Sequence, residues 1–136
     1  MSNTSGILQP GSLLSENNLS GSIPSCFNTS SLSHVFLNSN LLEGQLSYAF
    51  YNSNSLETLD LRENRFSGNI PQWIGNLSSL RVILLRGNHF EGTIPEQLCQ
   101  MKRLSMIDLS YNDLSGQIPH CLGNITLEVT KDKSSI

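Results

Sequence analysis

The chain has 136 residues, a length that suits one domain, and carries a formal net charge of −3 with only 14% charged residues. This weak charge excludes the strongly basic surface of a nucleic-acid-binding protein and a highly charged tail. Apolar residues make up 38% of the chain, so a core can form, but no apolar run reaches the roughly 20 residues that a membrane-spanning helix needs.

The N-terminal segment, residues 1–7, is predicted to be disordered. The opening "MSNTSGILQPGS" has neither the basic start nor the hydrophobic stretch of a signal peptide, so taken literally the chain would stay in the cytosol. Later features are typical of secreted proteins. We therefore expect the chain to be a fragment of a longer protein.

From residue 8 to residue 126 the sequence repeats one unit about five times, with the pattern L-x-x-L-x-L-x-x-N-x-L-x-G-x-I-P. Equivalent positions recur at a constant step, as in the series Leu32, Leu56, Leu80 and Leu104 and the series Gly44, Gly68, Gly92 and Gly116. The first unit is one position shorter, as the step from Gly21 to Gly44 shows. A fixed period of this length over several aligned columns predicts a solenoid.

Each unit contains one predicted strand. In "LETLDLREN", residues 56–64, apolar Leu59 and Leu61 alternate with Thr58, Asp60 and Arg62, which is the period of a half-buried strand. Strands are expected near residues 34–37, 58–61, 82–85 and 106–109. Stacked units would place them side by side in a parallel sheet about 4.8 Å apart.

An asparagine follows each strand, and these asparagines are predicted to form a hydrogen-bonded ladder inside the solenoid. The side-chain amide can both donate to and accept from the backbone of adjoining turns. An unpaired buried amide costs roughly 1–3 kcal/mol, which explains why one residue type fills the column. The predicted ladder residues are Asn17, Asn40, Asn64, Asn88 and Asn112.

The end of each unit combines glycine and proline, which argues against an array of amphipathic helices, because both residues would break each helix. The glycine allows an unusual φ or a close approach of neighbouring turns. Proline suits the first turn of a short helix and stands at Pro24, Pro71, Pro95 and Pro119, whereas the second unit has Ser47. Short helical or 3-10 turns are therefore predicted on the outer side, where Trp73 is interpreted as a packing residue.

The segments "LSGSIP", "FSGNIP" and "LSGQIP" closely resemble the unit of plant-specific extracellular leucine-rich repeats, and the similarity covers roughly residues 12–126. The resemblance is nearest to the later repeats of plant receptor-like proteins. It implies an α/β solenoid, a right-handed leucine-rich repeat superhelix with the parallel sheet on its concave face and short helical turns on its convex side. Residues 127–136 resemble the start of a truncated island region.

The resemblance also implies a function as a binding module. The chain would be the ligand- or co-receptor-recognising segment of a plant cell-surface receptor-like protein in defence or development, on the extracellular side of the plasma membrane. Its partners would be a peptide or protein ligand and a co-receptor kinase, and membrane attachment would use parts absent from this chain. Three alternatives stay open: a secreted inhibitor of cell-wall-degrading enzymes, a receptor kinase ectodomain fragment, and a non-functional truncated gene copy.

The outward positions of the strands are the candidate ligand-binding residues. Arg62 and Arg86 share one column and Asp60 and Asp108 share the next, so they could form a solvated Arg–Asp network of little energetic value or a recognition surface. With apolar anchors, the candidates are Phe36, Asp60, Arg62, Leu84, Arg86, Met106, Asp108 and Tyr111.

Five N-x-S/T sequons are candidate N-glycosylation sites: Asn3, Asn18, Asn28, Asn76 and Asn124. The last three follow one another at intervals of two repeats, so we expect them on one edge of the solenoid. Asn18 lies beside the ladder residue Asn17, where poor accessibility is expected.

Nothing in the sequence supports catalysis or a cofactor. Asp108 has no His or Ser at triad spacing, and the three histidines follow no metal-ligand pattern. An odd number of cysteines, Cys26, Cys99 and Cys121, leaves at least one thiol unpaired within the chain. Cys99 and Cys121 are interpreted as small buried residues of the convex segments, and their disulfide state stays open.

Overall fold

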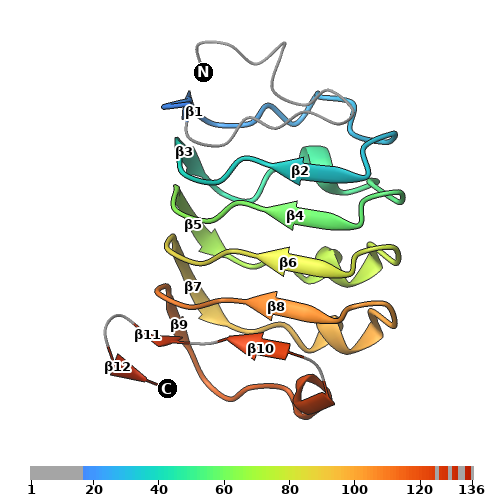
Figure 1. Ribbon diagram of the computed structural model, residues 1–136, viewed down its shortest axis with the longest axis vertical. Helices are drawn as coiled ribbons and strands as arrows, with labels where there is room; N and C mark the ends of the chain where they lie inside the picture. The colour runs from blue at the N-terminus through green and yellow to red at the C-terminus, as the bar shows by residue number, and fades with distance from the viewer. Residues whose placement is uncertain (1–16, 125, 129, 132–133, 136) are drawn as a thin grey trace.

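The computed structural model describes residues 17–124, 126–128, 130–131 and 134–135. The chain is a solenoid in which successive units stack from the N-terminal to the C-terminal end (Figure 1). Each complete unit contains a strand of a first sheet, a turn, a strand of a second sheet and a short 3-10 helix. The expected 1–7 segment lies outside the described residues.

The first sheet is parallel and forms the concave face. Its strands, in spatial order, are β10 (Thr126–Glu128), β8 (Met106–Asp108), β6 (Val82–Leu84), β4 (Thr58–Asp60) and β2 (His34–Phe36). Four of these strands lie where the alternation of leucines predicts them. Their central residues Val35, Leu59 and Ile83 are buried and stand in register, as period-2 patterning requires.

A second parallel sheet, which the sequence pattern did not predict, lies along the adjoining side of the stack (Figure 1). Its strands, in spatial order, are β1 (Ser20–Gly21), β3 (Leu41–Gly44), β5 (Arg65–Asn69), β7 (His89–Thr93) and β9 (Asp113–Ser115). β3, β5 and β7 contain the whole L-x-G or F-x-G part of their units, whereas β1 and β9 contain only a part of it. The glycines there have positive φ, from 78° at Gly68 to 92° at Gly44, a conformation that favours glycine.

Short 3-10 helices form the convex side: η1 (Tyr48–Phe50), η2 (Gln72–Asn76), η3 (Glu96–Gln100) and η4 (His120–Asn124). Pro71 and Pro95 stand at the N-caps of η2 and η3. In the second unit Ser47 takes this place, with its hydroxyl accepting from Ala49 N–H at 3.1 Å and donating to the Ile23 carbonyl at 2.9 Å. A side-chain cap therefore replaces the preset φ of proline.

The core is a continuous column of leucine, isoleucine and phenylalanine side chains between the two sheets and the helices. Leu56, Leu80 and Phe66 are completely buried, and Phe66 stacks on Phe90 with ring centroids 6.3 Å apart. Each unit supplies the same layers of this core. Consequently no single unit encloses its own hydrophobic face, which is the physical reason for the repeat.

The asparagines after the strands connect neighbouring turns. Asn64 Oδ1 accepts from Leu42 N–H at 3.0 Å, while Asn64 Nδ2 donates to the carbonyls of Leu37 at 2.9 Å and Leu61 at 3.1 Å. The same arrangement recurs at Asn88 and Asn112. Hydrogen bonds of this kind satisfy backbone groups that lie too deep for water.

Two members of this column are at its N-terminal end. Asn40 is 5% exposed and accepts the N–H groups of Asn17 and Leu19 at 3.0 and 2.9 Å. Asn17 differs from the other four predicted ladder residues because it is exposed. It stands at the beginning of the described residues, where the stack of units starts.

The residue before each of the later ladder asparagines has a left-handed backbone: Ser39, Glu63, Gly87 and Tyr111, with φ from 55° to 73°. This conformation costs roughly 1–2 kcal/mol for a residue with a Cβ. The cost is offset because hydrogen bonds between the backbones of neighbouring units continue through the turn. Ser39 N–H donates to the Arg62 carbonyl and Glu63 N–H to the Arg86 carbonyl, both at 2.8 Å.

The last turn of the solenoid is shorter than the others. Met106 pairs with Val82, one full period before it, whereas Thr126 pairs with Met106 although the chain between them is shorter than one period. The first sheet therefore continues through residue 128, beyond the expected repeat boundary at residue 126. It is followed by the antiparallel pair β11 (Thr130–Lys131) and β12 (Ser134–Ser135).

Candidate recognition face

The concave face is lined by the outward residues of the first sheet and by the turn residues that follow them. One register row contains Phe36, Asp60, Leu84 and Asp108, and the neighbouring row contains His34, Thr58, Val82 and Met106. All eight predicted ligand-binding residues therefore lie on or beside one sheet. Their exposure differs widely, and this difference separates structural residues from candidate binding residues.

Asp60 and Arg62 form a tight pair in which the carboxylate is buried. Arg62 Nε donates to Asp60 Oδ1 at 2.8 Å and Arg62 Nη2 donates to Asp60 Oδ2 at 2.7 Å. Asp60 is 2% exposed, whereas 40% of the Arg62 side chain is exposed. Arg62 and Asp60 do pair, but not as a solvated network, because the guanidinium covers the Asp60 carboxylate and makes a bidentate contact with it.

This pairing has an electrostatic consequence for Arg62. The hydrogen bonds that Arg62 donates to Asp60 raise the pKa of the Arg62 guanidinium above its ordinary value. Partial burial opposes this rise, while the negative charges of Asp60, Asp108 and Glu63 add to it. The Nε–Nη2 edge, which is the edge that grips an external carboxylate, is already occupied. Arg62 is therefore a structural residue first, with only the remaining part of its guanidinium open to a ligand.

Asp108 is also buried, at 7% exposed, and its Oδ1 accepts from Ser110 N–H at 3.0 Å. Asp60 makes the equivalent bond to Arg62 N–H at 3.2 Å. Both carboxylates therefore hold the start of the left-handed turn that follows their strand. The alternation rule placed them on the outer side of the strand correctly, but it could not show that the turn folds over them.

Arg86 has a different environment from Arg62. Its side chain is 46% exposed, its Nε lies 3.9 Å from Glu63 Oε1, and its guanidinium stands 4.9 Å from the centroid of the Tyr111 ring. The Glu63 side chain is itself 57% exposed, so this ion pair contributes little to stability. Arg86 can therefore exchange Glu63 for a ligand group at a small energetic cost.

Apolar residues adjoin this cation. Leu84, Met106 and Phe36 are half-buried on the concave face, and Tyr111 is 39% exposed. The Phe36 ring stacks on His34 with centroids 6.1 Å apart. The concave face thus presents a cation, aromatic rings and aliphatic side chains. Asp60 and Asp108 are buried and contribute little to its surface.

The sequons Asn18, Asn28 and Asn76 are exposed. Accessibility at Asn18 is therefore better than its position beside Asn17 suggests. Asn3 lies outside the described residues, as does the side chain of Asn124.

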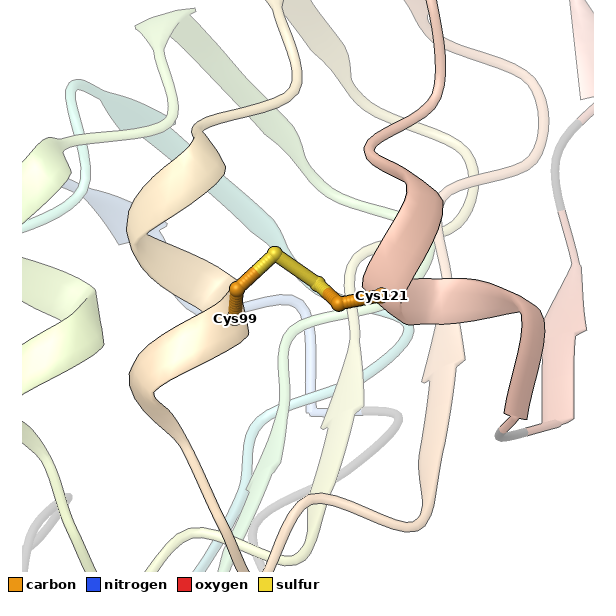
Figure 2. The surroundings of a disulfide bond; sticks show 2 residues. All are labelled: Cys99 and Cys121. Carbon is orange, nitrogen blue, oxygen red and sulfur yellow. A yellow bond between two sulfur atoms is a disulfide. The ribbon is translucent and has the colours of Figure 1, made fainter.

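Cys99 and Cys121 form a disulfide that connects η3 to η4 across neighbouring turns (Figure 2). Their Cα atoms are 5.6 Å apart. The interpretation of both as small buried residues is wrong, because Cys99 is exposed and Cys121 half-buried on the convex surface. Cys26 is a free, exposed cysteine.

Within the described residues, no group of three or more His, Cys, Asp or Glu side chains is arranged to hold a metal ion. The same part of the chain has no helix with the length and hydrophobicity needed to cross a bilayer.

The chain matches the model of the leucine-rich repeat family over residues 30–90 and 54–114. These overlapping matches together span residues 30–114, which is more than half of the sequence, and the chain belongs to the leucine-rich repeat family. No curated protein matches it.

Solved structures narrow the class to plant extracellular leucine-rich repeats. The Arabidopsis receptor kinase HAESA, solved with the peptide hormone IDA and the co-receptor SERK1, is 38% identical with a TM-score of 0.78 over 86% of this chain. The plant peptide hormone receptor RGFR1, solved with RGF2, is 36% identical with a TM-score of 0.80 over 85% of this chain. This chain spans only 21% and 19% of those two proteins.

The ectodomain of the receptor kinase SOBIR1 from Arabidopsis thaliana is a third similar structure. It is 28% identical, with a TM-score of 0.82, and the similarity covers 90% of this chain and 68% of that ectodomain. The stacked units, the two sheets and these similarities agree on one fold.

Proposed function

We propose that this chain is the ligand- or co-receptor-recognising segment of a plant cell-surface receptor-like protein and that the part of the concave face around Arg86 makes the contact. One observation carries the proposal: Arg86 and Tyr111 are exposed just after the neighbouring strands β6 and β8, and half-buried Leu84 of β6 lies on the same concave face. Similar ectodomains are solved with peptide hormones and with a co-receptor, which supports a peptide or protein partner.

The side chains around Arg86 indicate which chemical groups a partner would need. The guanidinium of Arg86 can donate two parallel hydrogen bonds to a carboxylate, and the Tyr111 ring beside it restricts its orientation. Leu84 and Met106 offer apolar contact area at one side. A peptide with an acidic group next to an apolar residue fits this arrangement.

Two further observations support an extracellular setting for the protein. The Cys99–Cys121 disulfide is suited to an oxidising compartment, and exposed sequons suit a secreted glycoprotein. We therefore place the segment outside the plasma membrane, in a protein anchored by other parts and acting in defence or development. Its role is binding and not catalysis.

A receptor kinase ectodomain is the second candidate, favoured by the receptor kinases HAESA and SOBIR1 among the similar structures. The complete coding sequence distinguishes the two candidates. A kinase domain after the membrane anchor identifies a receptor kinase, and a short tail identifies a receptor-like protein.

The binding test uses the full-length protein and a panel of synthetic acidic and neutral peptides, with affinity measured by calorimetry. The variants are Arg86→Glu on the concave face and Arg65→Glu on β5, both exposed arginines with the same change of charge. We expect Arg86→Glu to weaken binding of acidic peptides by roughly tenfold or more, as the loss of a central Arg contact does. Arg65→Glu should retain the affinity.

Expression level and proteolytic stability are measured beside affinity for each variant. Unchanged binding of every peptide that the wild-type protein binds, in a well-folded Arg86→Glu variant, would move recognition to another surface.

A further inference from the structure

Three aromatic side chains lie together on the convex side, where the repeat pattern predicts only short helical turns. The Tyr48 and Tyr51 rings stack with centroids 4.5 Å apart and an interplanar angle of 20°. Both rings meet Trp73 of the next unit edge-on, at 6.0 and 5.7 Å. The half-buried position of Trp73 agrees with the packing role expected for it. Tyr48 does not fit such a role, because Tyr48 is 58% exposed.

The Tyr48–Tyr51 pair, of which Tyr48 is exposed and Tyr51 half-buried, borders an open depression of about 270 Å³. Its lining includes Phe27, Asn28, Ser30, Tyr48, Tyr51 and Asn52. The volume lies just below the roughly 300 Å³ at which small-molecule pockets begin, so the depression suits one small ring. The sequon asparagine and the tyrosine pair thus share one hollow.

The local geometry of Asn28 leaves its amide nitrogen for modification. Asn28 Oδ1 accepts from Ser30 N–H at 3.1 Å and from the Ser30 hydroxyl at 2.7 Å. Neither of these bonds uses Nδ2, which is the atom that N-glycosylation modifies. Thr29, between them, is buried and donates to the Ala49 carbonyl at 2.6 Å, so the sequon is fixed against η1. The Asn28 side chain is therefore held next to the unit that carries Tyr48.

We propose that Asn28 carries an N-linked glycan whose first N-acetylglucosamine packs on the Tyr48–Tyr51 pair. In the attachment step the Asn28 Nδ2–C1 bond forms while the bond from C1 to a polyprenyl diphosphate donor breaks. The diphosphate leaves with the electron pair, and the amide loses one proton to a base. The apolar C–H face of the sugar ring then covers the exposed aromatic face, an arrangement that the negative charge of the ring face favours.

This inference rests on the proposed extracellular setting, so the test must separate the two. Asn76 provides the separation, because it is a second exposed sequon, in η2. A glycan at Asn76 reports that the protein has passed through the secretory route, independently of anything at Asn28.

The experiment uses the full-length protein made in plant cells, with its glycans trimmed to a single N-acetylglucosamine. Glycopeptide mass spectrometry measures occupancy at Asn28 and Asn76. Hydrogen exchange then measures the protection of the backbone amides of residues 48–53. The comparison is a cycle of four proteins, namely wild type, Asn28→Gln, Tyr48→Ala and the double variant, with Tyr48→Phe as a fifth protein that serves as the control.

We expect Asn28 to be occupied and its sugar to slow exchange of these amides by about 2- to 10-fold, the range of one aromatic contact. The protection should disappear in Tyr48→Ala and remain in Tyr48→Phe, which keeps the ring and loses only the hydroxyl. Equal protection by the sugar with and without the Tyr48 ring would overturn the proposal, since the glycan would then extend into solvent. An empty Asn28 beside an occupied Asn76 would overturn it as well, while leaving peptide recognition on the concave face intact. If both sites were empty, the proposal and its secretory premise would fail together.

Discussion

The asparagine ladder inside the solenoid and the contacts between successive helices on the convex side both join one unit to the next, but they do so with different side chains. The ladder uses asparagine in every unit. On the convex side, equivalent positions of successive helices meet as Tyr51 with Trp73, Gly75 with Gln97, and Cys99 with Cys121. These pairs comprise an aromatic contact, a close backbone approach and a disulfide.

The difference shows which constraints fix a residue. A ladder side chain must accept from one backbone group and donate to others at set positions, and among the side chains only a primary amide offers both functions with this reach. The convex pairs need only to fill the space between two helices, so each can have its own chemistry. Three changes of sequence test this distinction, from the largest expected effect to the smallest.

The strongest test removes one ladder amide with Asn88→Ala. The buried Phe66 N–H then loses its partner, and the carbonyls of Leu61 and Leu85 each lose one of two amide contacts. At roughly 2 kcal/mol for the orphaned N–H and 1 kcal/mol for each carbonyl contact, the loss of unfolding free energy should be about 4 kcal/mol. Chemical denaturation of the ectodomain measures it.

Asn69→Ala is the matched control, because Asn69 lies in β5 and is exposed. It should cost well under about 1 kcal/mol, as surface substitutions do. Equal costs for the two variants would contradict the structural role assigned to the ladder.

The second test breaks the convex disulfide with Cys99→Ser/Cys121→Ser. The cross-link has a sequence separation of 22, and a loop of this size contributes about 3 kcal/mol by restricting the unfolded chain. Denaturant unfolding with and without a thiol reductant should show the same loss as the double variant. Cys26→Ser should be neutral, because Cys26 is a free, exposed thiol. If the reductant left the unfolding free energy of the wild-type protein unchanged, a stabilising role for the disulfide would be refuted.

The third test inserts one methyl group with Gly75→Ala. A Cβ at Gly75 would lie 2.5 Å from the Gln97 carbonyl oxygen and 2.8 Å from Gln97 Cβ, so backbone must move. We expect a loss of about 1–3 kcal/mol, the usual cost of overpacking, measured as a lower denaturation midpoint. Gly123→Ala offers the same change in η4, where nothing lies within 4 Å, and should be neutral. A neutral Gly75→Ala would mean that the convex column is looser than its contacts indicate.

The sequence predicted the parts of the fold that repeat with one period. The first sheet follows from alternating leucines such as Leu59 and Leu61, and the ladder follows from the asparagine column. The second sheet was missed because a strand such as β5, with the sequence RFSGN, contains one buried apolar residue and no alternation of period 2. Its pairing depends on the stack and not on local propensity.

The candidate site was predicted less completely than the fold. The eight chosen residues lie on or beside the concave sheet, but alternation alone gives Asp60 and Arg86 the same exposed status. Only the turn geometry shows that Arg62 covers Asp60 while Arg86 stays open. The disulfide was missed because its sequence separation of 22 is shorter than one period, so no column of the repeat aligns Cys99 with Cys121.

The ladder also gives the solenoid a direction. Each asparagine reaches back to the unit before it: Asn88 accepts from Phe66 N–H and donates to the Leu61 carbonyl, and both belong to the preceding unit. If the unit that contains Asn88 unfolds, the buried Phe66 N–H of the preceding unit loses its partner. Asn64, the ladder residue of that preceding unit, keeps its contacts with Leu42, Leu37 and Leu61. Unfolding that begins at the C-terminal end should consequently proceed unit by unit, because each lost unit leaves the one before it with an unsatisfied backbone group.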